Sequence, residues 1–210
     1  MDQAAKQMLI ANYRDLLKRH GTGPEVGQWS KEGQLFRFAK LIEIGDLRGQ
    51  RVLDLGCGIG DLYPFLLQTF GEVDYTGIDL VPEIVDAAVK RHPKASFRCL
   101  DASVDTIQET FDYVLISGMF NNAFPDSSAF LRQTVSRAFL VCRNGLAFNF
   151  ISTHVQAVDP GLAYHDPAAV LDFCLKELSG RCTMAVHYER RDVAVFVYRE
   201  GRSSAVTTAD

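Results

Sequence analysis

The sequence lacks the segments that carry a chain into or across a membrane. Its first residues, Met1 to Gln7, are polar and lead into a mixed helical pattern, so the apolar core of a signal peptide is missing. No stretch approaches the roughly 20 consecutive apolar residues that a bilayer-spanning helix needs. We therefore expect a cytoplasmic protein without a membrane partner.

The sequence also lacks the cysteine pattern of a disulfide-bonded or zinc-binding protein. The chain has five cysteines, an odd number, and no two of them form a Cys-x-x-Cys motif. Neither a disulfide framework nor a zinc site is therefore indicated, and we expect reduced thiols in or near the core and no metal site. The five are Cys57, Cys99, Cys142, Cys174 and Cys182.

Positive charge is scarce. The 22 basic residues stand against 26 acidic ones, for a formal net charge of −4, so no broad positive field draws the chain onto nucleic acid. An apolar fraction of 47% and a charged fraction of 23% are those of an ordinary globular protein. The length suits one domain, because a chain of this size buries roughly 70% of its unfolded surface.

Two helices are predicted before the regular part of the fold. Apolar residues recur at helical spacing from Gln3 to His20, where Gly21 follows as a stop signal. They recur again from Ser30 to Ile44, with Ser30 as the N-cap. We assign residues 1–46 to an N-terminal helical extension.

Beyond residue 50, short β-rich runs alternate with helical segments, which predicts a parallel sheet with helices on both faces. The predicted strands cover residues 51–55, 74–78, 96–99, 113–116 and 147–151, and the predicted helices cover residues 61–70, 82–91, 128–139 and 167–178. Two further strands, 181–188 and 193–199, are joined by so short a turn that they must pair antiparallel. The sheet is therefore mixed, in a domain of residues 47–200, and the polar tail 201–210 is expected to be disordered.

A glycine turn links the first predicted strand to the helix after it. The run Asp54-Leu55-Gly56-Cys57-Gly58-Ile59-Gly60 stands at this junction. Glycine allows a tight turn and the close approach of a ligand, and open α/β sheets bind ligands at such turns. No histidine lies near Cys57 in the sequence, so we expect its small side chain to pack rather than to act as a nucleophile.

Acidic residues around this turn indicate a cationic ligand. A dinucleotide-binding loop would place its third glycine at position 61, where this chain has Asp61. Asp54, Asp79 and Asp101 end or follow predicted strands, and together these acids would repel a diphosphate. A ligand with a sulfonium and an ammonium against one carboxylate would be attracted. An NAD-linked dehydrogenase is the alternative that the acids disfavour.

Two of the acids stand where a nucleoside would be recognised. Asp79 follows the glycine turn by about 20 residues, the spacing at which a carboxylate meets a ribose, although it could instead cap the helix beginning at Pro82. Asp101 could accept a hydrogen bond from an adenine amine while Ala102 offers its backbone N–H; a simple turn role for Asp101 is the alternative. Ser117, just after the fourth predicted strand, would border the reacting centre.

Together, these residues resemble the class I S-adenosylmethionine-dependent methyltransferases (EC 2.1.1) over about residues 50 to 200. The resemblance implies a Rossmann-like, doubly wound, seven-stranded mixed sheet whose last strand is antiparallel. It implies S-adenosylmethionine as cofactor, with the methionine part at the glycine turn, the ribose at Asp79 and the adenine at Asp101 and Ala102. The cofactor-binding residues it implies are Asp54, Gly56, Cys57, Gly58, Asp79, Leu80, Asp101, Ala102 and Ser117.

The N-terminal helices look like the lid that such enzymes add for substrate. Trp29 and Arg37 in this lid are further candidates for cofactor binding, Arg37 either as a partner of the methionine carboxylate or as a solvated helix charge. Residues 118–122 read Gly-Met-Phe-Asn-Asn, where many amino-directed DNA methyltransferases carry Asp/Asn-Pro-Pro-Tyr. No cysteine motif of the cytosine C5 enzymes is present either.

Methyl transfer needs mainly the alignment of acceptor, methyl and sulfur, and a general base only if the acceptor must lose a proton. His154, Tyr164 and His165 are candidate bases, with an ordinary loop side chain as the alternative for each. We favour a small-molecule acceptor that is methylated on O or N over a macromolecular one, because the sequence indicates no basic groove. A protein or RNA acceptor, or an S-adenosylmethionine-binding module without catalysis, stays open, as does the oligomeric state.

Overall fold

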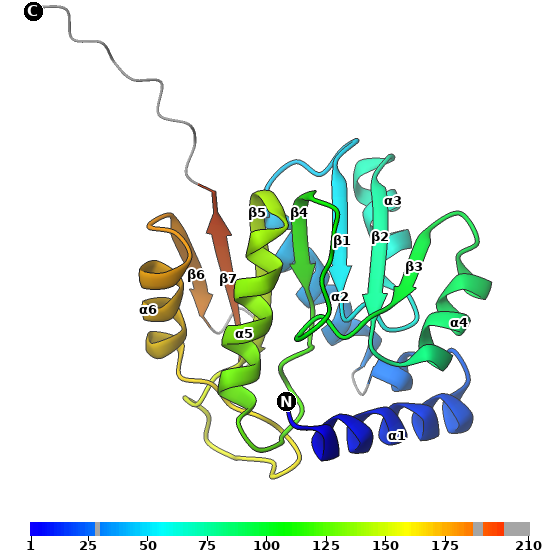
Figure 1. Ribbon diagram of the computed structural model, residues 1–210, viewed down its shortest axis with the longest axis horizontal. Helices are drawn as coiled ribbons and strands as arrows, with labels where there is room; N and C mark the ends of the chain where they lie inside the picture. The colour runs from blue at the N-terminus through cyan, green and yellow to red at the C-terminus, as the bar shows by residue number, and fades with distance from the viewer. Residues whose placement is uncertain (28–29, 187–190, 200–210) are drawn as a thin grey trace, which may run out of the picture.

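The computed structural model describes residues 1–27, 30–186 and 191–199 and shows one seven-stranded sheet in the order β3-β2-β1-β4-β5-β7-β6 (Figure 1). All seven predicted strands are present, as β1 (Arg51–Leu55), β2 (Asp74–Asp79), β3 (Ser96–Cys99), β4 (Phe111–Ile116), β5 (Cys142–Ile151), β6 (Cys182–Val186) and β7 (Asp192–Tyr198). Strand β5 starts five residues earlier than predicted. The polar residues Arg143 and Asn144 interrupt the apolar pattern in the sequence, although this segment pairs with the neighbouring strands.

Strand direction follows the prediction. β1 pairs in parallel with both β2 and β4, and β7 runs antiparallel to β5 and to β6. The seven-stranded, mixed, Rossmann-like sheet is thereby confirmed. The chain leaves β1 toward β2 and β3 on one side and returns to β4 on the other. In open α/β sheets, this reversal of strand order creates the crevice in which ligands bind.

Helices cover both faces of the sheet. The helices are α1 (Gln3–His20), α2 (Lys31–Leu41), α3 (Leu62–Phe70), α4 (Pro82–Arg91), α5 (Ser127–Leu140) and α6 (Pro167–Glu177). One face packs against α5 and α6, and the opposite face packs against α2 and α3. Neighbouring residues of one strand point to opposite faces: Val52 packs in the core beside α2 and α3, and Leu53 packs in the core beside α5 and α6. The strands are therefore buried on both faces, as is usual for a parallel sheet covered by helices.

Local sequence sets the helix ends. Ser30 Oγ accepts a hydrogen bond from the Gly33 backbone N–H at 3.1 Å, so the predicted N-cap of α2 is confirmed. Pro82 and Pro167 begin α4 and α6, where the missing N–H of proline has no cost. The second predicted helix is shorter than expected, because its last residues, Ile42–Ile44, form a 3₁₀ turn.

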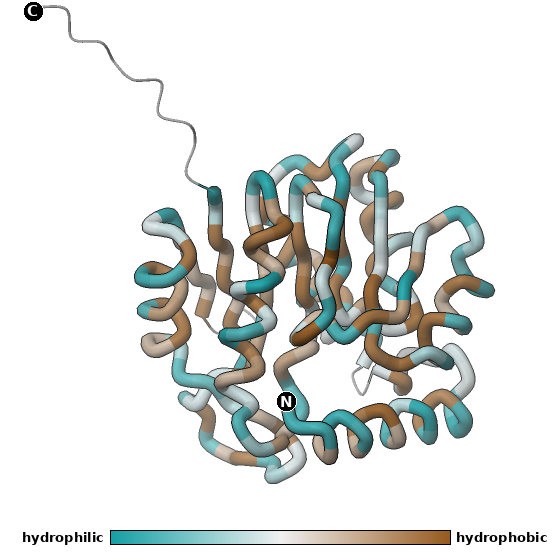
Figure 2. Tube along the Cα trace, in the orientation of Figure 1, coloured by the Kyte–Doolittle hydropathy of each residue, from teal (hydrophilic) through white to brown (hydrophobic). Residues whose placement is uncertain are grey.

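Helix α1 differs from α2 in how deeply it is buried. Among its side chains only Ala5 is fully buried, whereas α2 places Phe38 and Leu41 in the core beside the sheet. Figure 1 shows α1 lying across the molecule below the arrowheads of β1 and β2, and Figure 2 shows it as mainly hydrophilic with hydrophobic patches. α1 is thus a cover at the carboxyl ends of the strands, and α2 is part of the body.

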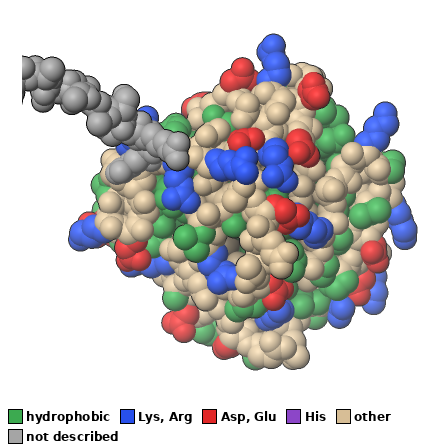
Figure 3. Space-filling model, turned by 45° about the horizontal axis from the view of Figure 1, so that its top comes forward, with side chains coloured by type: hydrophobic (Ala, Val, Ile, Leu, Met, Phe, Trp, Pro, Cys, Tyr) green, Lys and Arg blue, Asp and Glu red, His purple; other side chains and the backbone are tan. Residues whose placement is uncertain are grey.

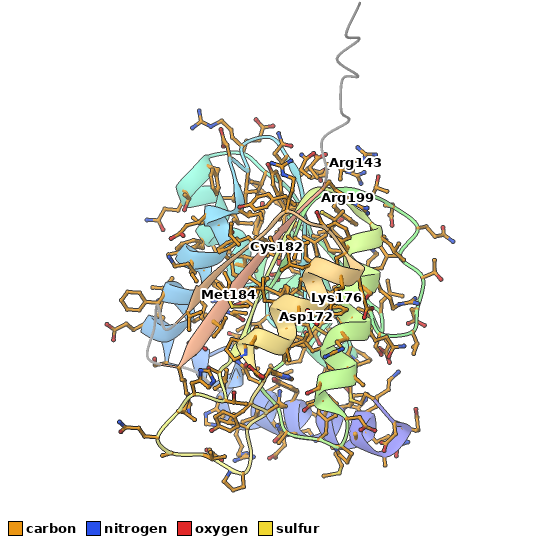
Figure 4. The ribbon with its side chains drawn as sticks, turned by 90° about the vertical axis from the view of Figure 1, so that its left-hand side faces the viewer. Arg143, Asp172, Lys176, Cys182, Met184 and Arg199 are labelled. Carbon is orange, nitrogen blue, oxygen red and sulfur yellow. The ribbon has the colours of Figure 1, made fainter. Side chains whose placement is uncertain are left out.

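The sheet ends at the β6–β7 hairpin. Cys182 and Met184 on β6 are half-buried and pack toward the core under α6, while Asp172 and Lys176 pair on the outside of that helix at 2.9 Å (Figure 4). Figure 3 shows basic and acidic side chains interspersed on the face it displays. No helix in the described residues is long and apolar enough to cross a bilayer. The predicted disordered tail, 201–210, lies outside the described residues.

Candidate cofactor site

A pocket opens at the carboxyl ends of β1, β2 and β4, with α1 and α2 contributing to its wall. Its cavity has a volume of about 140 Å³. Ten of the eleven residues predicted to bind cofactor line this one pocket: Arg37, Asp54, Gly56, Cys57, Gly58, Asp79, Leu80, Asp101, Ala102 and Ser117. The eleventh, Trp29, lies outside the described residues. The fold thus gathers residues that the sequence places up to 80 positions apart.

The glycine turn is shaped by a conformation that only glycine adopts easily. Gly60 has φ +80°, and a Cβ on it would lie 2.8 Å from a ring carbon of Phe97. The backbone N–H groups of Gly56 and Cys57 both donate to the Ile78 carbonyl, at 2.8 and 3.0 Å. These bonds tie the turn to the end of β2. The Cys57 side chain is buried, and burial raises the pKa of its thiol well above the usual value, in keeping with a packing role.

Asp79 connects the glycine turn to the start of α4. Its Oδ2 accepts a hydrogen bond from the Gly58 N–H and its Oδ1 accepts one from the Val81 N–H, both at 3.0 Å. The N-cap of α4 is Val81, so the alternative role of Asp79 as the helix cap is wrong. Burial raises the pKa of Asp79, and the two N–H donors oppose that rise. The carboxylate is held rigidly at the pocket wall.

The Asp101 carboxylate accepts three polar contacts, two from Ser103 and one from Lys6. Oδ1 accepts hydrogen bonds from the N–H and hydroxyl of Ser103, at 3.0 and 2.6 Å, and Oδ2 pairs with Lys6 Nζ at 2.7 Å. Burial works to raise its pKa, but the hydrogen bonds from Lys6 and Ser103 outweigh burial and hold the pKa below its usual value. Asp101 is therefore an ionised carboxylate tied to α1, beside Ala102 at the pocket wall.

Asp54 is the most deeply buried acid of the pocket. It is 2% exposed, and its Oδ2 accepts a hydrogen bond from the Tyr75 hydroxyl at 2.7 Å. Burial raises its pKa to about 7; the Tyr75 hydrogen bond opposes the rise, and the charges of Asp79 and Asp61 add to it. Near neutral pH this carboxyl therefore exchanges readily between its neutral and charged forms.

Helices α1 and α2 supply contacts that the sequence analysis missed. Besides Lys6, the Tyr13 hydroxyl accepts a hydrogen bond from the Asn122 side-chain amide at 3.1 Å. Gln34 of α2 donates its side-chain amide to Asp61 at 3.2 Å. The available signal was helical spacing, because Lys6, Leu9 and Tyr13 fall on one face of α1. Only the fold shows that this face covers the pocket.

Arg37 is buried rather than solvated. It is 5% exposed, and its Nη2 pairs with Asp192 Oδ2 of β7 at 2.7 Å. The alternative of a solvated helix charge for Arg37 is therefore wrong. Because Arg37 also lines the pocket, it joins α2 to both the sheet and the site.

None of the three candidate bases lines the pocket. His154 is exposed, and the Tyr164 hydroxyl accepts a hydrogen bond from the Asp159 N–H at 2.8 Å. The buried His165 has its Nε2 3.1 Å from the Phe120 carbonyl oxygen, and burial lowers its pKa. All three residues belong to the loop between β5 and α6, outside the wall of the pocket in the free protein.

The strand order and the pocket at its reversal define a Rossmann-like protein with an acid-lined ligand site. Residues 52–145 match the family described as "Methyltransferase domain". The chain is 31% identical over 153 residues to the "Putative methyltransferase" of Mycobacterium tuberculosis, covering 69% of this chain and 90% of that protein. It is 33% identical over 73 residues to a fatty-acid O-methyltransferase of Mycolicibacterium smegmatis, covering 33% of this chain and 27% of that protein.

Among solved structures, the fold is similar to that of magnesium protoporphyrin IX methyltransferase from Synechocystis with bound S-adenosylmethionine. The TM-score is 0.66 at 18% identity, and the match covers 93% of this chain and 97% of that one. The chain belongs to the class I S-adenosylmethionine-dependent methyltransferases, and its cofactor is S-adenosylmethionine.

The residues present fit this cofactor. Asp61 pairs with Arg91, and Asp101 pairs with Lys6, but within the described residues no lysine, arginine or histidine lies in ion-pair distance of Asp54 or Asp79. Asp54 is buried and Asp79 is half-buried, and acids withdrawn from water without a basic partner carry a desolvation cost that a cationic ligand relieves. The pocket thus has the negative charge that a sulfonium and an ammonium require.

Proposed function

We propose that the pocket holds S-adenosylmethionine across the ends of β1, β2 and β3. Asp79 binds the ribose hydroxyls, Asp101 and the Ala102 N–H bind the adenine, and the glycine turn with Asp54 holds the methionine part. The observation that carries this placement is the pair of carboxylates, buried Asp54 and half-buried Asp79, that have no basic partner within the described residues. Leu80 and Ser117 line the same pocket and complete the binding surface.

We further propose that the protein moves the methyl group to an O or N atom of a small-molecule acceptor. The similarity to a fatty-acid O-methyltransferase, in the part of the chain that they share, supports such an acceptor. The pocket supports it too, because its wall near β4 is formed by the apolar side chains Met119, Phe124 and Phe130. With a net charge of −4, the chain has no excess of basic residues to favour an RNA acceptor.

Within the N-terminal extension, helix α1 acts as a lid, whereas α2 belongs to the body of the domain. α1 reaches the pocket wall through Lys6 and reaches the loop after β4 through Tyr13. It also pairs with α4, where Arg14 Nε lies 2.7 Å from Glu83 Oε1. These contacts cross the pocket at separate points, and closing over a site in this way excludes water from the reaction.

Alignment supplies the catalysis. When bound, the cofactor provides a methyl group activated by the sulfonium. The chain holds the loop after β4 in place, since the Gly118 N–H donates to Asn149 Oδ1 at 2.7 Å. Burial raises the pKa of Tyr13, so this pocket residue stays protonated and does not act as a base. Holding two reactants in attack geometry contributes about 7–11 kcal/mol.

A binding and transfer experiment tests the proposal. We expect calorimetry to show micromolar affinity for S-adenosylmethionine and S-adenosylhomocysteine and much weaker binding of NAD. With labelled cofactor, we expect transfer to carboxylic acids, hydroxylated compounds or amines in a small-molecule extract, and about tenfold less transfer by Asp79→Ala at a cofactor concentration below saturation. Label found only in protein or RNA fractions would reject the acceptor class, and cofactor binding without any transfer would reject catalysis.

A further inference from the structure

A tyrosine on β2 fixes the most buried acid of the pocket. Tyr75 is 3% exposed, and its hydroxyl donates to Asp54 Oδ2 at 2.7 Å. The ring is clamped by Tyr63, with centroids 5.1 Å apart, and by Phe97, with centroids 5.7 Å apart. Aromatic pairs of this kind favour a defined geometry, so the ring packing holds the hydroxyl oxygen beside Asp54. The carboxylate that it contacts is oriented in turn.

The Tyr75 hydroxyl acts only as a donor here. Burial, with the charge of Asp54 next in size, raises the pKa of Tyr75 well above its usual value, so the phenol keeps its proton. A hydrogen bond to a charged acceptor is among the stronger kinds in proteins. It therefore favours the ionised form of Asp54, in a place where burial favours the neutral form.

The other charged and titratable groups around Asp54 decide what it can bind. From the elements packed around the site these are Asp79 at the end of β2, Cys57 in the glycine turn, Asp61 before α3, and Arg37 of α2 with its partner Asp192 of β7. The charges of Asp79 and Asp61 disfavour a charge on Asp54. The Cys57 thiol is neutral, and Arg37 is ion-paired to Asp192. The charge of a bound cation is thus what completes the environment of an ionised Asp54.

We propose that Tyr75 is a positioning residue that turns the Asp54 carboxylate toward the ammonium of the cofactor's methionine part, so that cofactor binding releases a proton from Asp54 to solvent. The inference rests on the proposed placement of the methionine part at the glycine turn. On binding, the neutral carboxyl loses its O–H proton, and the carboxylate pairs with the ammonium, which keeps its own protons.

The affinity for an ammonium-bearing ligand therefore rises with pH. Asp54 is about half protonated near pH 7 in the free protein, and protonated Asp54 does not pair with the ligand. Affinity for S-adenosylhomocysteine should increase about tenfold from about pH 6 to about pH 7.5, because each pH unit below a pKa removes about nine-tenths of the ionised form. Replacing Tyr75 by Phe keeps the ring and removes the donor, which moves this rise to higher pH.

The experiment measures calorimetric affinity and proton release at several pH values for wild type, Tyr75→Phe and Tyr63→Phe. Tyr63→Phe is the matched control, since it removes a hydroxyl from the same aromatic cluster without touching Asp54. The ligands are S-adenosylhomocysteine and methylthioadenosine, which keeps adenine, ribose and sulfur but has no ammonium. Variants are compared at equal pH, so the titration of the ligand's own amine cancels.

We expect Tyr75→Phe to bind S-adenosylhomocysteine about tenfold more weakly near pH 6, with the deficit shrinking as the pH rises, while Tyr63→Phe follows wild type. Methylthioadenosine should bind all three proteins equally at every pH. A pH-independent affinity for S-adenosylhomocysteine, or parallel pH profiles for Tyr75→Phe and wild type, would overturn the inference and leave the cofactor site intact. Failure of both ligands to bind wild type would instead overturn the proposed site, and the inference with it.

Discussion

Replacing Asp54 by Asn should stabilise the free protein and weaken cofactor binding. The carboxyl pKa rises from 3.8 to about 7 on folding because of burial. A raised acid pKa means that the folded state binds more protons than the unfolded state, so stability is full below the unfolded pKa and is lost as pH rises toward the folded pKa. Because a pKa change of one corresponds to about 1.4 kcal/mol, the loss of stability approaches roughly 4 kcal/mol above neutral pH.

The pH dependence isolates this effect. Asn keeps the acceptor for the Tyr75 hydroxyl but buries an amide, at a cost of about 1–3 kcal/mol that does not vary with pH. The advantage of Asp54→Asn over wild type should therefore grow by about 2 kcal/mol between about pH 5.5 and about pH 8. A chain of this length gains about 2–4 °C in Tm for each kcal/mol.

Urea denaturation of both proteins at the two pH values measures the change, and calorimetry with S-adenosylhomocysteine measures binding. We expect affinity to fall by at least tenfold, because the ammonium loses a charged partner. A constant stability difference across this pH range would refute the raised pKa. An unchanged affinity in the folded variant would remove Asp54 from the site.

Further variants test other parts of the structure. Asp79→Ala should weaken cofactor binding about tenfold or more, and an unchanged calorimetric affinity would place the ribose elsewhere. Removal of residues 1–23 should leave a folded sheet by circular dichroism but little turnover, because α1 buries only Ala5 fully; full turnover would reject the lid. His154→Ala should keep wild-type turnover, whereas a loss of turnover of about 10²–10⁴-fold would indicate that His154 acts as a general base. Asp192→Ala should cost about 3–5 kcal/mol in urea denaturation, because it removes the carboxylate that pairs with the buried Arg37 guanidinium, and a cost near zero would contradict this.

Local pattern alone determined much of this protein. Neighbouring residues alone predict the N-cap at Ser30, the helix starts at Pro82 and Pro167, and the glycine run from Asp54 to Gly60, since backbone conformation depends on short-range sterics and hydrogen bonds. The antiparallel hairpin followed from a turn too short for a crossover. The class of ligand followed from the acids at the strand ends.

The tertiary structure decided which distant residues meet. Lys6 reaches Asp101, Tyr75 reaches Asp54 and Arg37 reaches Asp192 only because the strand order and the path of α1 bring them together. The same side chains elsewhere would be an ordinary helix charge or a core aromatic. The loop before α6 shows the converse, because His165 reads as a base but turns inward to the Phe120 carbonyl. Side-chain direction in an irregular loop has no period in the sequence, so packing alone settled it.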